Sequence, residues 1–389
     1  MRIEGRRIHI AGSADKDSPE QLLRYAHELV AHLVQALSKE GAIFLVGVGK
    51  DPSAHPDDPT SPAIIFDWTV LAAAHKSMRD GVALAQGVQG RLISTIGTSK
   101  TEQQIPESRR RIWKELREAN AVKIEFIEPG WASGGLRRTR QAQLGDMFIA
   151  LSGGEGVEHL AQEYAAAGKP VIPLDLDIGS SRGDGSGGAA RLAREALAHP
   201  ERFVRLSDPD AAGDLLARLA THQGAAAITN VVQAVIDVIH ALESPTAFYV
   251  RLLNNALPEF SSVEQFFRNV LDPVVKNFGY KAVEMGREAN TYTWMNEAIF
   301  DSLHYSSVVV VDLTGLRNNC FMEFGYALGH GNRVLLTAQK GTHLPFDSFA
   351  LDCHFWEDSL SENERIKQLE EYWQRTIDRP PLVKPRSIL

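Results

Sequence analysis

The sequence predicts an α/β protein built from two doubly wound, parallel-sheet domains of the Rossmann-like or flavodoxin-like kind. Short apolar runs alternate with helical patterns, and the runs are apolar on both faces, which is typical of strands in a parallel sheet covered by helices. The alternation starts afresh after Pro245, and 389 residues are about two to three times a typical domain. With 44% hydrophobic and 23% charged residues, the composition excludes wholesale disorder.

The first block carries the alternation from the N-terminus onward. Strands are expected over 7–11, 43–48, 92–96, 124–127, 147–151 and 171–174, with helices over 19–38, 107–119, 136–144 and 157–167. The stretch 178–188 is rich in glycine and serine, and it predicts a loop that is either a lid or a disordered surface insertion.

A helical pattern over 211–242 ends at Glu243-Ser244-Pro245, and a second α/β block follows it. Strands are expected there over 247–253, 280–283, 307–313 and 333–337, and helices over 262–278, 293–304 and 320–329. We therefore divide the chain into a domain over 1–222, a helical linker over 223–246 and a second domain over 247–389.

Composition also limits the function classes. No apolar run approaches the roughly 20 residues of a membrane span, and the first residues lack a signal-peptide pattern, so a cytoplasmic protein without membrane partners is expected. Two cysteines and 13 scattered histidines without metal-ligand spacing predict no metal site. A net charge of −8 disfavours general nucleic-acid binding, but it is compatible with a small anionic ligand held by a few arginines.

The sharpest local signal lies in the second block, at the strand 307–313 and the helix after it. Asp312 ends the strand, Asn318 or Asn319 is a natural N-cap for the next helix, and Glu323 lies in the first turn of that helix, off its apolar stripe. Glu323 is therefore expected to point toward the carboxyl end of the sheet. From position alone, complementing the helix dipole is the more ordinary role of such a carboxylate.

This segment resembles the nucleoside 2-deoxyribosyltransferase-like group and the TIR-like domains related to it. The resemblance rests on D-L-T at 312–314, N-N at 318–319 and M-E-F-G at 322–325, and it covers about residues 247–345. It implies that Glu323 is the catalytic carboxylate. It also implies that Arg287, Asp312 and Asn319 hold ribose or phosphate, and that Glu297 is a possible second carboxylate.

The same resemblance implies cleavage of an N-glycosidic bond. Such cleavage develops an oxocarbenium cation, which a neighbouring carboxylate stabilises. When the leaving group is the cationic nicotinamide of NAD⁺, no general acid is needed, and one carboxylate suffices. NAD⁺ is accordingly expected as a substrate, with no cofactor.

In the first block, three features predict nucleotide binding. Gly12 and Ser13 follow the first strand, and Arg137, Arg138 and Arg140 cluster in the sequence. A glycine-rich segment lies between a buried strand and a helix, where backbone amides bind phosphate; its members are Gly153, Gly154, Glu155 and Gly156. A tight turn and a solvated helix face are the ordinary alternatives.

The block resembles the SLOG superfamily over about residues 5–220. The LOG motif P-G-G-x-G-T-x-x-E reads S-G-G-E-G-V-E-H-L at 152–160, which keeps the glycines but lacks the threonine and the last glutamate. This difference favours binding without turnover. Similar SLOG domains, paired with sirtuin or TIR effectors in Thoeris-type bacterial defence, sense a cyclic ADP-ribose-like signal.

The leading hypothesis is therefore an antiphage NAD⁺ glycohydrolase that a nucleotide signal activates, acting as a homo-oligomer. One alternative is a deoxyribosyltransferase or N-glycosidase that acts on another nucleoside or nucleotide. The other alternative is a non-enzymatic nucleotide sensor. The identity of the signal, the oligomer geometry and the choice between linear and cyclic products stay open at this level.

Overall fold

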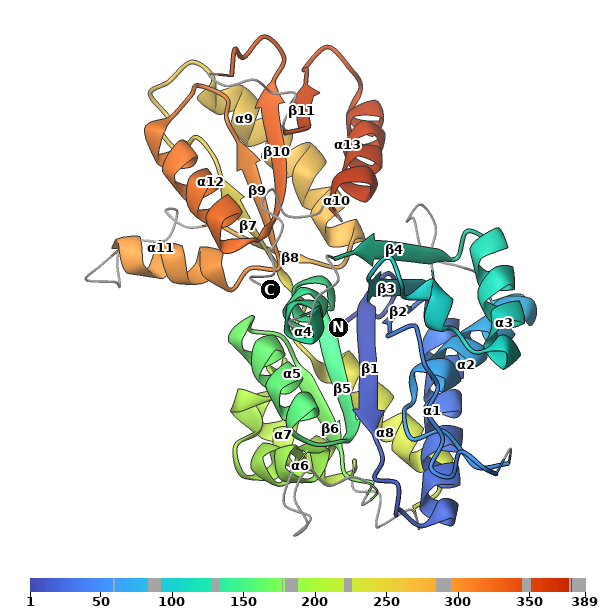
Figure 1. Cartoon of the computed structure of the whole chain (residues 1–389). Coiled ribbons are helices and arrows are strands. Elements are labelled where there is room, and N and C mark those ends of the chain that lie inside the picture. Colours follow the sequence, from blue (N-terminus) through green and yellow to red (C-terminus); the bar gives the residue numbers. More distant parts are fainter. Residues whose placement is uncertain are drawn as a thin grey trace. The chain divides into compact units, whose positions relative to one another are not determined.

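The chain forms two compact units that divide between Glu243 and Ser244, and each is considered by itself (Figure 1). The computed structural model describes residues 1–58, 60–82, 92–127, 133–176, 178, 188–219, 226–284, 295–344, 351–377 and 379. Within them, no helix is both long enough and apolar enough to cross a membrane.

Unit 1 contains a six-stranded parallel sheet in the order β4-β3-β2-β1-β5-β6. Its strands are β1 (Arg7–Ser13), β2 (Ile43–Leu45), β3 (Ile93–Gly97), β4 (Val122–Phe126), β5 (Met147–Ser152) and β6 (Val171–Leu174). Its helices are α1 (Glu20–Lys39), α2 (Asp67–Arg79), α3 (Glu107–Glu118), α4 (Ser133–Leu144), α5 (Glu155–Ala166), α6 (Gly188–Ala198), α7 (Ala212–Ala217) and α8 (Ile228–Ala241). Short 3₁₀ turns lie at Glu102–Gln104, Pro200–Arg202 and Pro209–Ala211.

The order of these strands reverses between β1 and β5. The chain moves outward from β1 to β4 and then returns through α4 to place β5 on the other side of β1. In open parallel sheets, ligands bind beyond the carboxyl ends of the two strands where the order reverses. We call this place the unit 1 switch point.

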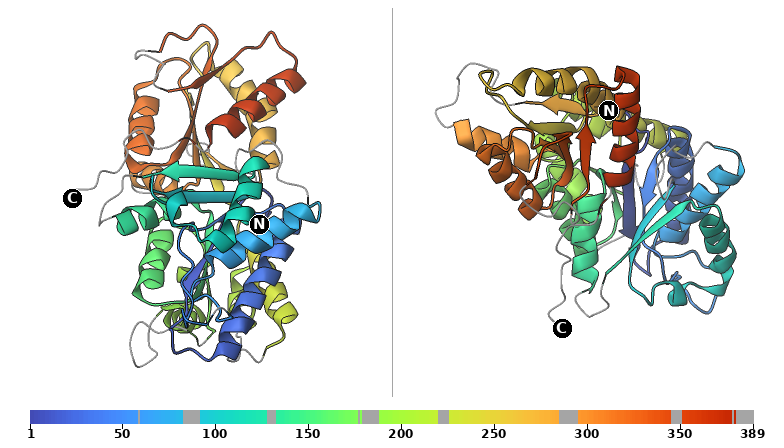
Figure 2. Two further views of the ribbon diagram at one scale, coloured as in Figure 1. Left: turned by 45° about the vertical axis from the view of Figure 1, so that its right-hand side comes forward. Right: turned by 90° about the horizontal axis from the view of Figure 1, so that it is seen from above.

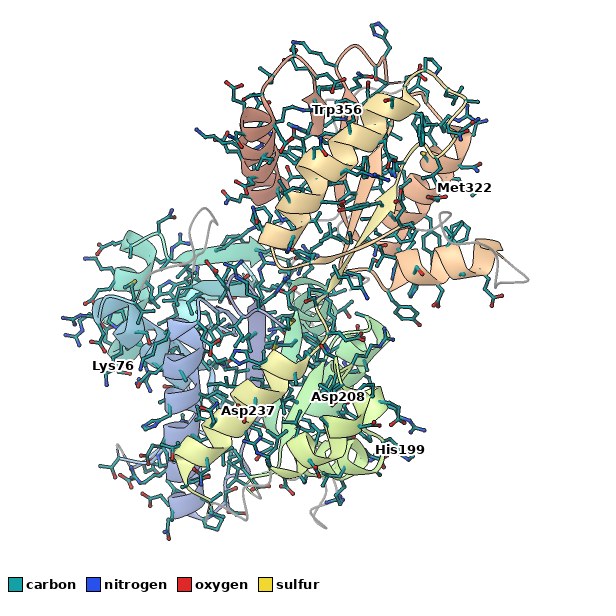
Figure 3. All side chains as sticks on the ribbon, turned by 180° about the vertical axis from the view of Figure 1, so that it is seen from behind. Lys76, His199, Asp208, Asp237, Met322 and Trp356 are labelled. Atoms are coloured by element: carbon teal, nitrogen blue, oxygen red, sulfur yellow. The ribbon has the colours of Figure 1, made fainter. Side chains whose placement is uncertain are left out.

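Helices cover both faces of the first sheet, as Figure 2 shows. Apolar residues of α1, α2 and α8 join the main core on one face, and residues of α4, α5 and α6 join a smaller core on the other. Helix α8 packs on α1 (Figure 3, where Asp237 marks α8), and Val231, Val235 and Ile239 are buried in the main core. The segment expected as a linker over 223–246 therefore contributes α8 to the core of unit 1.

Unit 2 contains a five-stranded parallel sheet in the order β11-β10-β9-β7-β8, which is the flavodoxin-like order. Its strands are β7 (Thr246–Val250), β8 (Lys281–Val283), β9 (Val308–Asp312), β10 (Arg333–Gln339) and β11 (Cys353–Trp356). Its helices are α9 (Phe260–Phe266), α10 (Asp272–Asn277), α11 (Met295–His304), α12 (Asn318–His330) and α13 (Glu362–Thr376), and a π-helical turn, Phe267–Leu271, joins α9 to α10. Here the order reverses between β7 and β9, at the unit 2 switch point.

Both sheets confirm the predicted fold class of two doubly wound parallel-sheet domains. In unit 2, α9, α10 and α13 cover one face, and α11 and α12 cover the other. The strand β11 and the helix α13 are additions to the predicted pattern. Helix α13 begins with a capping box in which the Ser361 hydroxyl accepts from the Glu364 amide, and the Glu364 carboxylate accepts from the Ser361 amide.

Candidate functional site

The loop after β9 leads directly into α12 at the unit 2 switch point. Cys320, Phe324 and Ala327 lie on the buried face of α12, as their helical spacing predicts. Arg317 occupies the N-cap position in place of the predicted asparagine, so Glu323 lies in the second turn of the helix and not in the first. It lies off the buried face and is half-buried. The sequence pattern thus separates the packing residues of α12 from its carboxylate.

The Glu323 carboxylate has no hydrogen bond or ion pair with any described residue. Burial raises its pKa from 4.5 to about 7, because little water is left to solvate the ionised form. A carboxylate that is partly desolvated and unpaired is ready to interact with a cation brought by a ligand. Strongly shifted, unpaired groups of this kind are typical of functional sites.

Asp312 lies beneath the protein surface, at the end of β9, and its exposed fraction is 0%. Its Oδ1 accepts from the Thr314 amide at 3.0 Å, and its Oδ2 accepts from Thr337 Oγ1 and Trp356 Nε1, each at 2.8 Å. Burial raises the pKa of Asp312, although these hydrogen bonds oppose the shift. Both oxygens are thus used inside unit 2, so this geometry favours a positioning role over contact with a ribose.

The structure describes two of the other three residues expected to bind substrate, Asn319 and Glu297. Asn319 is exposed in the first turn of α12, one turn before Glu323, and Glu297 is exposed in the first turn of α11. Neither makes a hydrogen bond or ion pair to Glu323 within the described part of the chain. Arg287 lies outside the described residues.

Arg251 is a charged residue at this switch point that the sequence analysis did not single out. It directly follows β7, its side chain is 1% exposed, and it pairs with Glu264 at 2.8 Å and with Glu284. Its guanidinium lies 4.8 Å from the ring centre of Phe267, while its Nη1 is buried without a hydrogen-bond partner among the described residues. In the sequence, Arg251 could have been noticed as a charged residue at the end of a buried strand.

In unit 1, the structure brings the predicted glycine segments together at the switch point. The Gly153 amide donates to the Ser13 carbonyl at 2.7 Å, and Ser13 is in register with Ser152 on β5. A Cβ on Gly12 would lie 1.7 Å from the Leu151 carbonyl oxygen. Gly153 has φ +74°, and a Cβ there would lie 2.3 Å from Val157 Cγ2. Glycine is therefore required at both positions for the strand ends to approach this closely.

Helix α5 begins directly after this glycine pair. Its first internal hydrogen bond runs from the Val157 amide to the Gly154 carbonyl at 2.9 Å. The amides of Glu155 and Gly156 precede that bond, and both residues are exposed. Amides at this end of a helix, together with its positive dipole end, favour anions such as phosphate.

Ser152 adds backbone strain to the same place. It is a non-glycine residue with φ 44°, it is 3% exposed, and its buried Oγ has no hydrogen-bond partner in the described parts of the chain. Strained residues with unsatisfied polar groups are concentrated at functional sites.

The three clustered arginines have different surroundings. Arg140 is buried and donates to both carboxylate oxygens of Glu125, at 2.5 and 3.0 Å. Arg138 Nε donates to His159 Nδ1 at 3.3 Å. Arg137 is exposed, and its charge acts on Asp67 at the start of α2. Arg140 therefore serves the fold, and Arg137 is the arginine best placed for a ligand.

Asp67 itself was not predicted as a site residue. Its Oδ1 accepts from the Gly47 amide at 2.9 Å, just after β2. Burial of the carboxyl raises its pKa, and the Gly47 hydrogen bond and Arg137 partly offset this effect. In the sequence, an aspartate before an apolar helical run reads as an ordinary first-turn acid.

Two further expectations concern loops and metals. Most of the glycine-serine loop over 178–188 lies outside the described residues; at its end, the Gly188 amide donates to Glu158 Oε1 at 2.9 Å. Over the described ranges, no group of three or more His, Cys, Asp or Glu side chains is placed to hold a metal ion.

Comparison with known proteins identifies the relatives of unit 1. Residues 3–239 match the family model described as "ATP nucleosidase Cap17-like, N-terminal". Two curated proteins named ATP nucleosidase Cap17, from Escherichia coli (strain KTE188) and Escherichia coli, are each 26% identical over 180 residues, which is 46% of this chain and 34% of theirs. The chain thus spans about a third of the length of these relatives. Because the family match covers more than half of the chain, the protein belongs to the Cap17-like N-terminal family.

Proposed function

We propose that the protein is an N-glycosidase of bacterial antiphage defence, in which unit 2 cleaves NAD⁺ and unit 1 binds the nucleotide signal that activates it. The proposal keeps the SLOG-like role for unit 1 and the TIR-like role for unit 2. The observation that carries it is Glu323, a half-buried carboxylate at the unit 2 switch point without a partner among the described residues.

The proposed chemistry uses this carboxylate alone. When the bond between ribose C1′ and the nicotinamide nitrogen breaks, the electron pair leaves with the ring, which becomes neutral nicotinamide. Ionised Glu323 stabilises the cation that develops at C1′ or bonds to it. Water then adds at C1′ and loses a proton, leaving ADP-ribose. Asn319, Glu297 and Arg287 are proposed to orient the substrate, and Asp312 fixes the strand ends beneath it.

A second candidate substrate is ATP, because the curated relatives carry the name ATP nucleosidase. Neutral adenine is a poor leaving group unless one of its ring nitrogens is protonated. With a pKa of about 7, Glu323 holds a proton in about half of the molecules at neutral pH, so it can also act as a general acid. The family match, however, lies over residues 3–239 and does not extend to Glu323.

Unit 1 is proposed to gate this activity through association of whole chains. Gating requires the signal to bind the active arrangement more tightly than the resting one, because equal affinity shifts no equilibrium. A constantly active NAD⁺ glycohydrolase would deplete the NAD⁺ of the cell that makes it. Control by a signal therefore fits a defence role.

The test incubates the full chain with NAD⁺, with ATP, and with deoxynucleosides plus free base, each with and without cyclic ADP-ribose isomers. Chromatography separates nicotinamide, adenine and exchanged nucleosides. We expect nicotinamide release that Glu323→Gln abolishes and that Glu371→Gln, an exposed carboxylate on α13, leaves unchanged. Release of adenine alone would favour the ATP candidate, and base exchange would favour a transferase. The absence of any product would favour a sensor.

A further inference from the structure

We propose that Asp67 accepts hydrogen bonds from the ribose hydroxyls of the nucleotide bound at the unit 1 switch point, and so selects ribonucleotides with a free 2′,3′-diol. The inference rests on the proposed nucleotide binding by unit 1. It adds a specificity-determining residue to that site.

The position of the Asp67 carboxyl is fixed by its backbone surroundings. Gly47 follows β2, and its amide donates to Oδ1 at 2.9 Å. A Cβ on Gly47 would lie 2.9 Å from the same oxygen, so a larger residue would push the carboxyl away. Among the described residues, only the Gly47 amide donates a hydrogen bond to this carboxyl. Oδ2 and the second lone pair of Oδ1 therefore stay available to a ligand.

The segment before α2 holds Asp67 beside the glycine segments. The Ala14 amide donates to the Ile64 carbonyl at 2.7 Å, and Ser13 forms a β-bridge with Ile65. Ser13 also accepts from the Gly153 amide. Asp67 and the α5 N-terminus therefore approach the same strand end, that of β1, from two sides.

Charge assigns different parts of a nucleotide to these two sides. The α5 amides attract phosphate, whereas a carboxylate repels it. Hydroxyl groups are neutral donors, and a carboxylate can accept two of them at once. In parallel-sheet folds that bind dinucleotides, a carboxylate near the end of the second strand binds the ribose in this way, and Asp67 lies beside the end of β2.

Ser152 supports a ligand at this place independently of Asp67. Its buried Oγ has no hydrogen-bond partner within the ranges that the structure describes, and its backbone has φ 44°, although it lies next to the glycine pair. A residue kept in this state at a strand end is more consistent with a binding site than with packing alone.

The competing explanation is that Asp67 serves only the fold, as a first-turn acid of α2 that accepts from Gly47. Such a role stabilises a helix by about 0.3–1 kcal/mol. It predicts that a substitution changes stability and weakens every nucleotide equally. Selection of the diol instead changes the ratio between ribose and deoxyribose ligands.

The parent protein for the experiment is the full chain with Glu323→Gln, in which no ligand is cleaved. Calorimetry follows its titration with AMP, 2′-deoxy-AMP, 3′-deoxy-AMP and ADP-ribose. We expect AMP to bind about 10-fold or more tightly than either deoxy form, since each lost bond to a charged acceptor costs about 1.5–3 kcal/mol. In Asp67→Asn, the ratio falls to about 2-fold, because AMP then loses two bonds to the charged acceptor and each deoxy form loses only one. Asp80→Asn, at the exposed far end of α2, keeps the full ratio.

The outcomes separate this inference from the function on which it rests. A parent protein that binds AMP and both deoxy forms equally overturns the role of Asp67 without any variant, and so does an Asp67→Asn protein that keeps the ratio. In both cases nucleotide binding by unit 1 stands. If none of these probes binds the parent protein, this inference is overturned, and if the cyclic ADP-ribose isomers also fail to bind, the proposed function of unit 1 fails as well.

Discussion

The indole N–H of Trp356 donates to Asp312 Oδ2 at 2.8 Å, joining the end of β11 to the end of β9. Thr337 on β10, the strand between them, donates to the same oxygen at 2.8 Å. One buried carboxyl group therefore ties together the carboxyl ends of three adjacent strands (Trp356 is labelled in Figure 3). Residues 313–317 run from this junction to α12, the helix that carries Glu323.

Replacing Asp312 should destabilise unit 2. Asp312→Ala leaves the buried Trp356 indole without its acceptor and the Thr337 hydroxyl with the Val311 carbonyl at 3.5 Å, and we expect a loss of about 2–4 kcal/mol in the free energy of unfolding. Denaturant titration measures the loss. Asp301→Asn, at an exposed position on α11, is the control and should unfold like wild type. Wild-type stability in Asp312→Ala would show that these bonds contribute little.

Glu323→Gln should keep the fold and lose activity. The change is isosteric and removes the charge that faces the developing cation, so a loss of about 10²-fold or more in turnover is expected. Nicotinamide release from NAD⁺ measures it. Near wild-type turnover in this variant would contradict the assignment of Glu323 as the catalytic carboxylate.

The same substitution should raise stability at alkaline pH. Because the pKa of Glu323 is about 7 in the folded chain and 4.5 as its ordinary value, ionisation disfavours the folded state. The folded state has its full stability below pH 4.5, where the carboxyl is protonated in both the folded and the unfolded chain. Part of this stability is lost as the pH rises through 7. Glu323→Gln should therefore be more stable than wild type at pH 8 by about 1–2 kcal/mol, allowing for partial exposure. At pH 4 the two melting temperatures should agree, and a constant difference would refute the linkage.

The pH dependence of catalysis should distinguish the two candidate substrates. Cleavage of NAD⁺ uses ionised Glu323, so kcat/KM should rise with pH through about 7. Release of adenine from ATP by the acid form would fall over the same range. Initial rates from pH 5.5 to 8.5 give the direction, and a flat profile would mean that Glu323 does not titrate in the reacting enzyme.

The arginines of α4 should separate into ligand and fold residues. Arg137→Ala should weaken activation by the signal, and the double variant with Arg138→Ala should weaken it further through lost charge-assisted bonds. Arg140→Ala breaks the buried pair with Glu125 and should lower stability by about 1–3 kcal/mol. Signal titrations measure activation, and thermal melts measure stability. If Arg137→Ala and Arg140→Ala had equal effects on activation and on stability, the separation would be contradicted.

Gly154→Asp should abolish the response to the signal, because a side chain and a negative charge would occupy the place proposed for phosphate at the α5 N-terminus. Glu323 and its surroundings in unit 2 should be unaffected. Light scattering with and without the signal measures association beside activity. A wild-type response would exclude this ligand site, and activation without association would exclude only the assembly step.

Sequence patterns predicted the elements whose signal is local. The buried run at β9, the apolar stripe of α12 and the glycines after β5 follow from alternation, helical spacing and backbone freedom. Helix α8 was placed in a linker because its packing on α1 joins residues far apart in the chain. Strand β11 is short, and its Trp356 is buried by partners that no local pattern reveals.

Roles within the candidate site were harder to predict than its location. Arg137 and Arg140 look equivalent in sequence, and only the buried Glu125 on β4 separates their roles. Asp312 looks like a ligand residue until its three donors are known. Asp67 looks ordinary until the fold places it against Gly47. In each case a distant residue decides the role.

The pairing of β1 with β5 has a consequence for how the protein is made. Ile8 pairs with Met147, whereas in unit 2 Val250 pairs with Val311. During synthesis, β1 emerges from the ribosome long before β5. The edge of β1 that pairs with β5 therefore stays unpaired while most of unit 1 is made. Contacts between residues so far apart in sequence also form slowly. The end of the sheet proposed to bind the signal is therefore completed only when β5 has emerged, and the unpaired edge of β1 is most exposed to aggregation before then.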